Sequence, residues 1–228
     1  MVKTAMADAS FPHPPPAMRA ALDALVRQDA RLAAIEPAAG PLPWRVRPSG
    51  FPGLLQAIVA QQISSAAAQA IWRRLSAVPN ALDPAGLAAL DDATLVAAGL
   101  SRPKVAHARA LAEAFRDGRL SDPALAALDD AEAVAAITAI RGLGPWTAEV
   151  YLLFALGRAD VFPAGDIAVA GAAAHLLGLP ARPGPAELRR LAEAWRPHRA
   201  LAARLLWHHW RHITGRPSMD DLSPGRPT

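Results

Sequence analysis

The stretch Ile140-Arg-Gly-Leu-Gly-Pro-Trp-Thr-Ala-Glu149 decides the fold of this 228-residue chain. Its two glycines are typical of a tight turn, and helical patterns of apolar residues flank them on both sides. Gly144 is suited to cap the following helix, and Pro145 to take its first position, where a missing N–H costs nothing. The turn therefore leaves backbone N–H groups at a helix N-terminus, where an anion such as phosphate can bind. An ordinary turn between two helices is the alternative interpretation of a bare Gly-x-Gly.

Helical patterns continue in both directions from this hairpin. Apolar residues recur at three- and four-residue spacing, and glycine and proline stand at the breaks. The predicted helices cover about 17–35, 51–76, 84–98, 103–117, 130–140, 145–156, 166–177, 185–195 and 198–213. No stretch has the pattern of a β-strand, so the sequence predicts an all-α fold.

Both ends of the chain lack helical patterns. Residues 1–16 end in Phe-Pro-His-Pro-Pro-Pro, and proline removes backbone donors and clashes with the preceding helical turn. Residues 216–228 are polar and contain proline and glycine. We therefore expect disordered tails over 1–16 and 216–228.

The composition is that of a folded globular protein, with 52% hydrophobic and 19% charged residues. The absence of cysteine excludes disulfides, cysteine nucleophiles, cysteine-ligated zinc and iron–sulfur clusters. No apolar run approaches the ~20 residues of a membrane span, and no secretory signal is visible. We therefore expect a cytoplasmic protein, associated with the bacterial nucleoid if it binds DNA, and without a membrane partner.

The charge balance is mildly basic. Lysine and arginine together number 24, against 20 acidic residues, and the isoelectric point is about 10.5. Such a balance suits a polyanionic partner, because phosphate contacts supply most non-specific affinity for nucleic acid. A biased genomic base composition would produce the same alanine-, proline- and arginine-rich sequence, so charge alone leaves both interpretations open.

Three stretches together resemble a known family. They are the run from Gly142 to Asp166, the segment Ala60-Gln-Gln-Ile-Ser-Ser65, and Trp195-Arg-Pro-His-Arg199 followed by Leu206-Trp207. This combination resembles the helix-hairpin-helix (HhH-GPD) DNA glycosylases, of the 3-methyladenine DNA glycosylase II type. The resemblance extends over roughly residues 17–213.

The resemblance implies a two-lobed architecture. Residues 17–49 and 159–215 would form a terminal helical lobe, and residues 50–158 a lobe that carries the helix-hairpin-helix over about 130–156. The damaged base would lie in a cleft between the two lobes. An enterobacterial relative has a further N-terminal α/β domain, for which this chain leaves no room, so the short, two-lobed form is expected.

The resemblance also implies roles for individual residues. Asp166 would be the catalytic carboxylate, and Gln62 would fill the gap that the flipped nucleotide leaves in the duplex. The implied DNA-binding residues are Gln61, Gln62, Ser64, Gly142, Gly144 and Thr147. The implied base-pocket residues are Trp146, Trp207, Val150, which replaces an aromatic residue of a relative, and Tyr151. Carbonyls of Thr138, Ile140 and Leu143 match positions that bind Na⁺ or K⁺ in such hairpins, and no other cofactor is expected.

The chemistry of base excision suits these residue types. Breaking the bond between sugar and base passes through an oxocarbenium-like transition state, which a carboxylate such as Asp166 can stabilise. An alkylated purine is already cationic, so it leaves without a strong general acid, and aromatic faces such as Trp146 and Trp207 attract it. A simple N-cap is the alternative role for Asp166, and both roles can hold at once.

The absence of a Schiff-base lysine in the hairpin's following helix and the absence of cysteine narrow the expected activity. Bifunctional relatives carry a Schiff-base lysine at the position of Trp146, and Lys104 lies in a different segment. Relatives that act on oxidised bases often carry a four-cysteine iron–sulfur loop. We therefore expect a monofunctional enzyme without lyase activity, acting as a monomer on double-stranded DNA with alkylated bases.

Three other functions remain open at this point. The chain could be a helix-hairpin-helix protein that senses damaged DNA without cutting it. It could be a glycosylase-lyase for oxidised bases, which borohydride would trap as a Schiff base. It could also be an all-α scaffold unrelated to DNA, which would show no salt-dependent affinity for a duplex.

Several residues have a structural interpretation beside a functional one. His208 and His212 stand one helical turn apart, but no third metal ligand is evident. Trp207 and Trp210 have the spacing of core residues in the last helix. Lys104 is an exposed basic residue or a phosphate contact. The pairs Asp91-Asp92 and Asp129-Asp130 are each followed by helical sequence, which is typical of helix caps.

Overall fold

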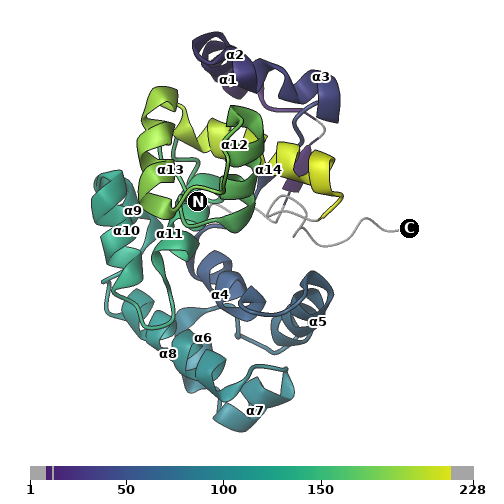
Figure 1. The fold of residues 1–228 in the computed structure, drawn as a ribbon. Helices are drawn as coiled ribbons and strands as arrows, with labels where there is room; N and C mark the ends of the chain where they lie inside the picture. Colours follow the sequence, from purple (N-terminus) through teal and green to yellow (C-terminus); the bar gives the residue numbers. More distant parts are fainter. Residues whose placement is uncertain (1–8, 12, 217–228) are drawn as a thin grey trace. The chain divides into compact units, whose positions relative to one another are not determined.

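The computed structural model describes residues 9–11 and 13–216. Regular structure in this part of the chain is almost entirely helical, which confirms the predicted all-α class (Figure 1). The helices of the described residues are α1 (Pro16–Gln28), α2 (Ala30–Ala33), α3 (Ile35–Ala39), α4 (Gly50–Ala60), α5 (Ser65–Ser76), α6 (Pro84–Ala89), α7 (Asp92–Ala97), α8 (Arg102–Arg116), α9 (Asp122–Ala127), α10 (Asp130–Thr138), α11 (Pro145–Phe154), α12 (Ile167–Leu177), α13 (Pro185–Ala192), the 3₁₀ helix η1 (Glu193–Trp195) and α14 (Arg199–Thr214).

Two short strands are the exception to the helical pattern. β1 (Ala9–Phe11) pairs antiparallel with β2 (Trp44–Val46), so that Phe11 lies opposite Trp44. The expectation that no stretch forms a strand is therefore wrong. The predicted tail over 1–16 is wrong at residues 9–11 and at Pro16, the first residue of α1. The remaining tail predictions for 1–8, 12 and 217–228 lie outside the described residues.

The chain divides into two compact units. Arg47–Tyr151 form the hairpin unit. The described residues of Asp8–Val46 and Leu152–Thr228 form the terminal unit. One boundary between the units falls within α11, after Tyr151.

Side-chain caps interrupt three of the predicted long helices, those over 17–35, 51–76 and 84–98, the last of which is divided into α6 and α7 at Asp91. The predicted helix over 17–35 ends at Gln28 because Asp29 has an extended backbone and its carboxylate accepts the Arg31 N–H at 3.1 Å. The predicted helix over 51–76 is divided by residues 61–64, and the Ser64 hydroxyl caps α5. Short polar side chains accept hydrogen bonds from nearby backbone N–H groups and so compete with a continuous helix. The spacing of apolar residues alone does not reveal these caps.

The first aspartate of each pair caps a helix, as predicted. Asp91 accepts the Thr94 N–H at 2.7 Å. Asp129 and Glu132 form a capping box, in which each side chain accepts the other residue's N–H. Such caps contribute about 1 kcal/mol each. The helix α9 was not predicted.

α8 is the central helix of the hairpin unit. α4, α6 and α7 pack against it. Its buried face carries Val105, Ala108, Leu111, Ala112 and Ala114, at the spacing expected of an amphipathic helix. The loops that follow α4 and α10 are therefore positioned by helices that share one core.

α14 is the central helix of the terminal unit. Every residue from Ala200 to His209 is buried, and α1, α3, α12 and η1 pack against this helix. A helix that is buried all round must be enclosed by neighbours on every side. None of the helices in the described residues combines the length and the apolarity that a membrane crossing requires.

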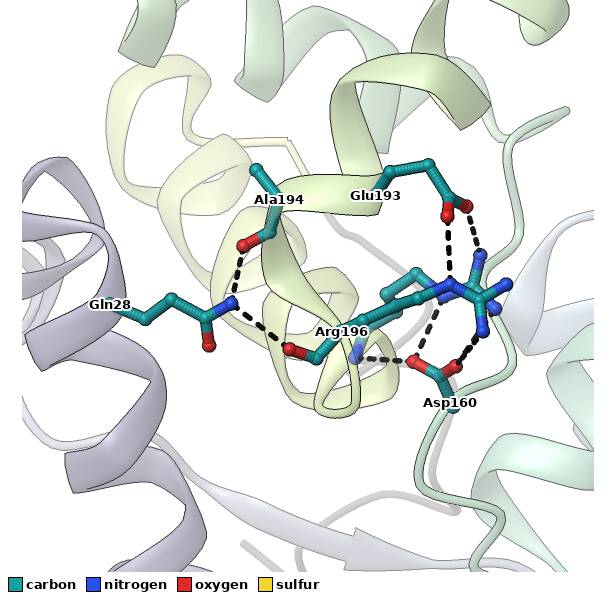
Figure 2. Close-up of polar contacts among 6 residues, drawn as sticks. Gln28, Asp160, Glu193, Ala194 and Arg196 are labelled. Atoms are coloured by element: carbon teal, nitrogen blue, oxygen red, sulfur yellow. Dashed lines mark hydrogen bonds and ion pairs between the residues drawn. The ribbon is translucent and has the colours of Figure 1, made fainter.

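A polar network fixes the first residues of α14 (Figure 2). Both carboxylate oxygens of Asp160 accept hydrogen bonds from Arg199, at 2.9 and 3.0 Å, and Arg196 donates to Asp160 at 3.0 Å. Glu193 accepts from the same two arginines, at 2.8 Å each. Gln28 donates its side-chain amide to the carbonyl oxygens of Ala194 and Arg196. The network therefore anchors the segment between α11 and α12, which ends in Asp166, within the terminal unit.

Candidate functional site

The hairpin between α10 and α11 requires glycine at its first glycine position. Gly142 has a φ of +91°, in the region that favours glycine. A Cβ atom there would lie 2.2 Å from Cγ of His107, so the site also has no space for a side chain. Gly144 differs, because no heavy atom lies within 4 Å of the corresponding position. Its carbonyl accepts the Ala148 N–H at 3.1 Å, so it caps α11 as predicted.

The hairpin presents backbone donors at the start of α11. Within the described residues, the N–H groups of Gly142 and Gly144 donate no hydrogen bond, and Arg141 and Gly144 are exposed. This arrangement can bind an anion, because the helix dipole adds to the unpaired donors. Thr147, the third predicted phosphate ligand, is a buried residue of the first helical turn.

The loop between α4 and α5, residues 61–64, is here called the wedge loop. Gln61 donates its side-chain amide to the Gly142 carbonyl at 2.8 Å. Gln62 is exposed and has a φ of +58°, which is uncommon for a residue other than glycine. Ser64 caps α5. The three predicted DNA-binding residues of this loop therefore have different surroundings, and Gln62 is the exposed glutamine of the pair.

An apolar residue of the wedge loop was missed by sequence reasoning. Ile63 is 38% exposed, directly after Gln62. Exposed apolar side chains of DNA-binding loops can enter a base step and unstack it. The available signal was an isolated isoleucine between glutamine and serine in a predicted DNA-binding segment.

Lys104 is partly buried, not exposed as one interpretation of the sequence expected. Its Nζ donates to the Val59 carbonyl at 2.7 Å, in the last turn of α4. Burial lowers the pKa of this amine from its ordinary value. A lysine near the end of a helix stabilises the unpaired carbonyls there, so the structure gives Lys104 a structural role.

Tyr151 uses its hydroxyl within the hairpin unit. The hydroxyl donates to Asp122 at 2.8 Å and accepts the Gly50 N–H at 2.7 Å. Tyr151 and Val150 are each 4% exposed. Burial, with the neighbouring Asp122 carboxylate, raises the pKa of the Tyr151 phenol far above its ordinary value. The phenol is therefore neutral, and it joins α11 to α9 and to the start of α4. Trp146, on the same helix, is partly exposed.

Asp166 is the N-cap of α12, in the terminal unit. Its Oδ1 atom accepts the N–H groups of Ala168 at 2.8 Å and Val169 at 2.9 Å. The residue is 7% exposed, so these two bonds orient the carboxylate in a largely dry environment. The N-cap interpretation is confirmed, and a catalytic role is compatible with it. The next residue, Ile167, is 65% exposed, and sequence reasoning did not single it out.

Trp207 is part of a buried cluster that the sequence did not reveal. Its ring stacks on Phe154, with 5.5 Å between ring centroids and 27° between ring planes. The Arg204 guanidinium lies over Phe154 at 4.3 Å and over Trp44 at 4.1 Å. Trp44, Phe154, Arg204 and Trp207 are here called the aromatic cluster. Trp207 is fully buried, which confirms the core interpretation of its spacing.

The histidines of α14 make contacts within the protein. His208 donates through Nε2 to the Gly40 carbonyl at 2.8 Å, and its Nδ1 accepts from Arg211 at 3.1 Å. His209 lies 3.0 Å from a nitrogen of His175, and burial lowers the pKa of His209. Among residues 9–11 and 13–216, no group of three histidine or acidic side chains could hold a metal ion. A metal site at His208 and His212 therefore has no third ligand in this part of the chain.

The hairpin carbonyls suit a monovalent cation. Ile140 accepts the Leu143 N–H at 3.0 Å and keeps a second lone pair on its oxygen. Backbone carbonyl oxygens are ligands for hard cations such as Na⁺ and K⁺. The donor set expected from Thr138, Ile140 and Leu143 therefore fits such an ion.

The predicted site residues fall into both units. The hairpin unit contains Gln61, Gln62, Ser64, Thr138, Ile140, Gly142, Leu143, Gly144, Trp146, Thr147, Val150 and Tyr151. The terminal unit contains Asp166 and Trp207. Within the hairpin unit, the structure brings the wedge loop and the hairpin into direct contact through Gln61 and Gly142.

The helical fold, the two-glycine hairpin and the carboxylate at the start of α12 agree with what comparison with known proteins shows. Residues 55–197 match the HhH-GPD superfamily base excision DNA repair protein, and the chain belongs to this family of DNA repair proteins. It is 32% identical to DNA-3-methyladenine glycosylase 1 of Schizosaccharomyces pombe over 158 residues, which are 68% of this chain and 69% of that protein.

Solved structures give the same assignment. The DNA-3-methyladenine glycosidase of Bacillus halodurans superposes with a TM-score of 0.79 and 30% identity, over 94% of this chain and 98% of that one. The 3-methyladenine DNA glycosylase of Schizosaccharomyces pombe, solved in complex with abasic DNA, gives a TM-score of 0.70 and 28% identity. That match covers 84% of this chain and 95% of the yeast chain.

Proposed function

We propose that this protein is a monofunctional DNA glycosylase that hydrolyses the N-glycosidic bond of alkylated bases, of the 3-methyladenine class, in double-stranded DNA. The observation that carries the proposal is that Asp166 is a buried residue whose carboxylate is oriented by two backbone N–H groups at the start of α12. The relatives named as 3-methyladenine glycosylases support the substrate class.

The proposed reaction begins with binding and flipping. The N–H groups of Gly142 and Gly144, with Thr147, would hold a phosphate near the lesion, and the positive dipole of α11 favours the anion. Gln62, with Ile63 beside it, would fill the space that the flipped nucleotide leaves. Flipping costs a few kcal/mol of unstacking, and a damaged base pair lowers that cost.

The proposed chemical step uses one carboxylate. The bond between the sugar C1′ and the base nitrogen breaks, and the base leaves with the bonding electron pair. Asp166 stabilises the positive charge that develops on the sugar. Water then adds to C1′ and loses a proton, which gives an abasic site and the free base.

The base pocket is proposed to be aromatic. Trp146 is partly exposed, so its ring could stack on a cationic purine. Trp207, held by the aromatic cluster, would be a rigid wall of the terminal unit. Val150 and Tyr151 stay predictions as pocket residues, and their burial supports a contribution through packing rather than through the Tyr151 hydroxyl.

Lyase activity is not expected. Lys104 is engaged with the Val59 carbonyl, and Trp146 takes the place of the Schiff-base lysine of bifunctional relatives. Borohydride reduction in the presence of alkylated duplex should therefore trap no covalent complex. We further propose that the protein acts in the cytoplasm as a monomer and needs no cofactor beyond a hairpin cation.

The proposal is tested by single-turnover release of 3-methyladenine from alkylated duplex DNA. Asp166→Asn keeps a capping side chain, because asparagine is as good an N-cap as aspartate, so the fold should survive. Release should fall by roughly two orders of magnitude or more, and strand breaks should appear only after alkali treatment. Glu187→Gln is a control at an exposed carboxylate of α13 in the terminal unit, and its release rate should stay close to wild type.

A non-catalytic DNA-binding protein is the second candidate. The observation that favours it is that capping alone explains the two bonds to Asp166. Tight binding of alkylated duplex by the intact protein, with no base release, would support this candidate and reject the glycosylase.

A further inference from the structure

The structure gives Gln61 a partner within the protein. Its side-chain Nε2 donates to the Gly142 carbonyl at 2.8 Å, across 81 residues of sequence. The residue is partly buried, whereas the next residue, Gln62, is exposed. Gln61 therefore connects the wedge loop to the hairpin through its side-chain amide.

Gly142 is held by a second contact. The His107 imidazole fills the space where a Cβ of Gly142 would stand, 2.2 Å from Cγ of His107. This contact is packing, because His107 Nδ1 is buried and makes no hydrogen bond with the described residues. The hairpin glycine is therefore fixed by α8 as well as by Gln61.

The end of α4 is fixed by the same helix. Lys104 and His107 lie three residues apart on α8, which places them on one face. Lys104 donates to the Val59 carbonyl in the last turn of α4, two residues before Gln61. α4, α8 and the hairpin thus form a closed set of contacts, in which Gln61 is the link between the wedge loop and the hairpin.

We propose that Gln61 is a positioning residue, which couples phosphate binding at the hairpin to insertion of Gln62 into the duplex. Gln62 follows Gln61 directly and has a φ of +58°, a strained conformation that persists only where the surroundings enforce it. A bonded Gln61 side chain supplies that constraint, because it leaves the backbone before Gln62 little freedom. This inference rests on the proposed function and names a residue that acts through another.

A double-mutant cycle separates this coupling from a direct DNA contact. Gln61→Met keeps the length of the side chain and removes the amide donor, and Gln62→Ala removes the wedge. Two quantities are measured for each single variant and for the double variant. One is single-turnover release of 3-methyladenine. The other is the fluorescence of a 2-aminopurine placed beside a tetrahydrofuran abasic analogue, which reports unstacking as the wedge enters.

Gln61→Met should lower base release and the fluorescence change roughly tenfold, as expected for a lost hydrogen bond that orients a loop. Affinity for undamaged duplex and its salt dependence should stay within about twofold of wild type, because no phosphate contact is lost. In the Gln62→Ala background, Gln61→Met should change both signals by less than about twofold. Gln61 acts by positioning the Gln62 side chain, so its loss has little effect once that side chain is absent.

Gln28→Met is the matched control. Gln28 also donates its side-chain amide to backbone carbonyls, those of Ala194 and Arg196, but it lies in the terminal unit. Its loss should leave the fluorescence change as in the intact protein.

The outcomes distinguish this inference from the proposed function. If the intact protein unstacks 2-aminopurine but releases no base, the glycosylase fails, and the fluorescence cycle still decides the role of Gln61. If base is released and the two substitutions are additive, the inference alone is overturned. An equal loss of undamaged-duplex affinity in Gln61→Met would identify a direct DNA contact, and no fluorescence change with intact protein would reject wedge insertion.

Discussion

The Trp207 ring stacks on the Phe154 ring at 5.5 Å, and this pair is buried in the core of the terminal unit. A tryptophan that the sequence associates with base recognition is therefore also a packing residue. The Arg204 guanidinium lies over the same Phe154 ring and donates to the Arg45 carbonyl at 3.0 Å. Loss of Trp207 must then affect stability as well as any pocket beside it.

Substitution of the two tryptophans that we propose for the base pocket, Trp146 and Trp207, should separate stability from activity. Trp207→Ala should lower the free energy of unfolding by about 3–5 kcal/mol, because a large buried ring leaves a cavity. Trp146→Ala should cost much less, because Trp146 is partly exposed, but it should reduce base release strongly. Urea unfolding and single-turnover release measure the two effects. A Trp207→Ala protein as stable as wild type would contradict the buried stacking.

The two hairpin glycines should respond differently to alanine. Gly142→Ala should destabilise the protein by about 2–4 kcal/mol, because it combines a positive φ with a clash against His107. Gly144→Ala meets no atom within 4 Å and should change stability by less than about 0.5 kcal/mol. Addition of His107→Ala to Gly142→Ala should recover part of the loss in thermal unfolding. No recovery would mean that backbone strain alone accounts for the effect.

Removal of the Tyr151 hydroxyl should affect stability alone. Tyr151→Phe loses hydrogen bonds to Asp122 and Gly50, which together stabilise the fold by about 1–3 kcal/mol. The rate of base release should stay within about twofold of wild type at a temperature where the variant is folded. Chemical denaturation and single-turnover assays check both parts. A large loss of release without loss of stability would instead place the hydroxyl in the reaction.

Asp29 should make stability depend on pH in acid. Hydrogen bonds from the Arg31 side chain, and then from the Trp195 indole, hold the pKa of Asp29 below its ordinary value near 3.8. The unfolded chain therefore binds this proton more readily. The stabilisation is complete above the ordinary pKa and is lost as the pH falls through the lower, folded value.

The free energy of unfolding of wild type, measured in urea from pH 7 to pH 3, should therefore decrease more steeply below about pH 4 than that of Asp29→Asn. Arg31→Met removes the main cause of the shift and should also flatten the curve. Parallel curves for wild type and Asp29→Asn would show that this carboxylate contributes nothing to the acid response.

Local sequence signals determined the secondary structure around the site. The Gly142–Gly144 turn, the proline at the start of α11 and the aspartate caps each act within a few residues of their own position. Asp129 with Glu132, and Asp166 with Val169, are bonded three residues apart. Such interactions form in any fold that allows the helix, so their residue types alone predict them.

Contacts between distant segments could not be predicted in this way. β1 is three residues long, too short for an alternating pattern, and it exists only because β2 lies beside it. The Asp29 carboxylate at the end of α1 also accepts the Trp195 indole N–H, from a residue 166 positions away. The hydrogen bonds of Lys104 and Tyr151 could not be predicted for the same reason, because their partners lie on other helices.

The sequence by itself determined the helical class, the hairpin with its two glycines, and the position of Asp166 at a helix N-terminus. Only the tertiary structure decided that Gln61 bonds to Gly142, that Trp207 stacks on Phe154, and that Tyr151 holds Asp122 and Gly50. The physical reason is the distance along the chain over which each kind of interaction acts. Backbone propensity and capping act over one helical turn, whereas these pairings form only when packing brings side chains from distant parts of the chain within 3–6 Å.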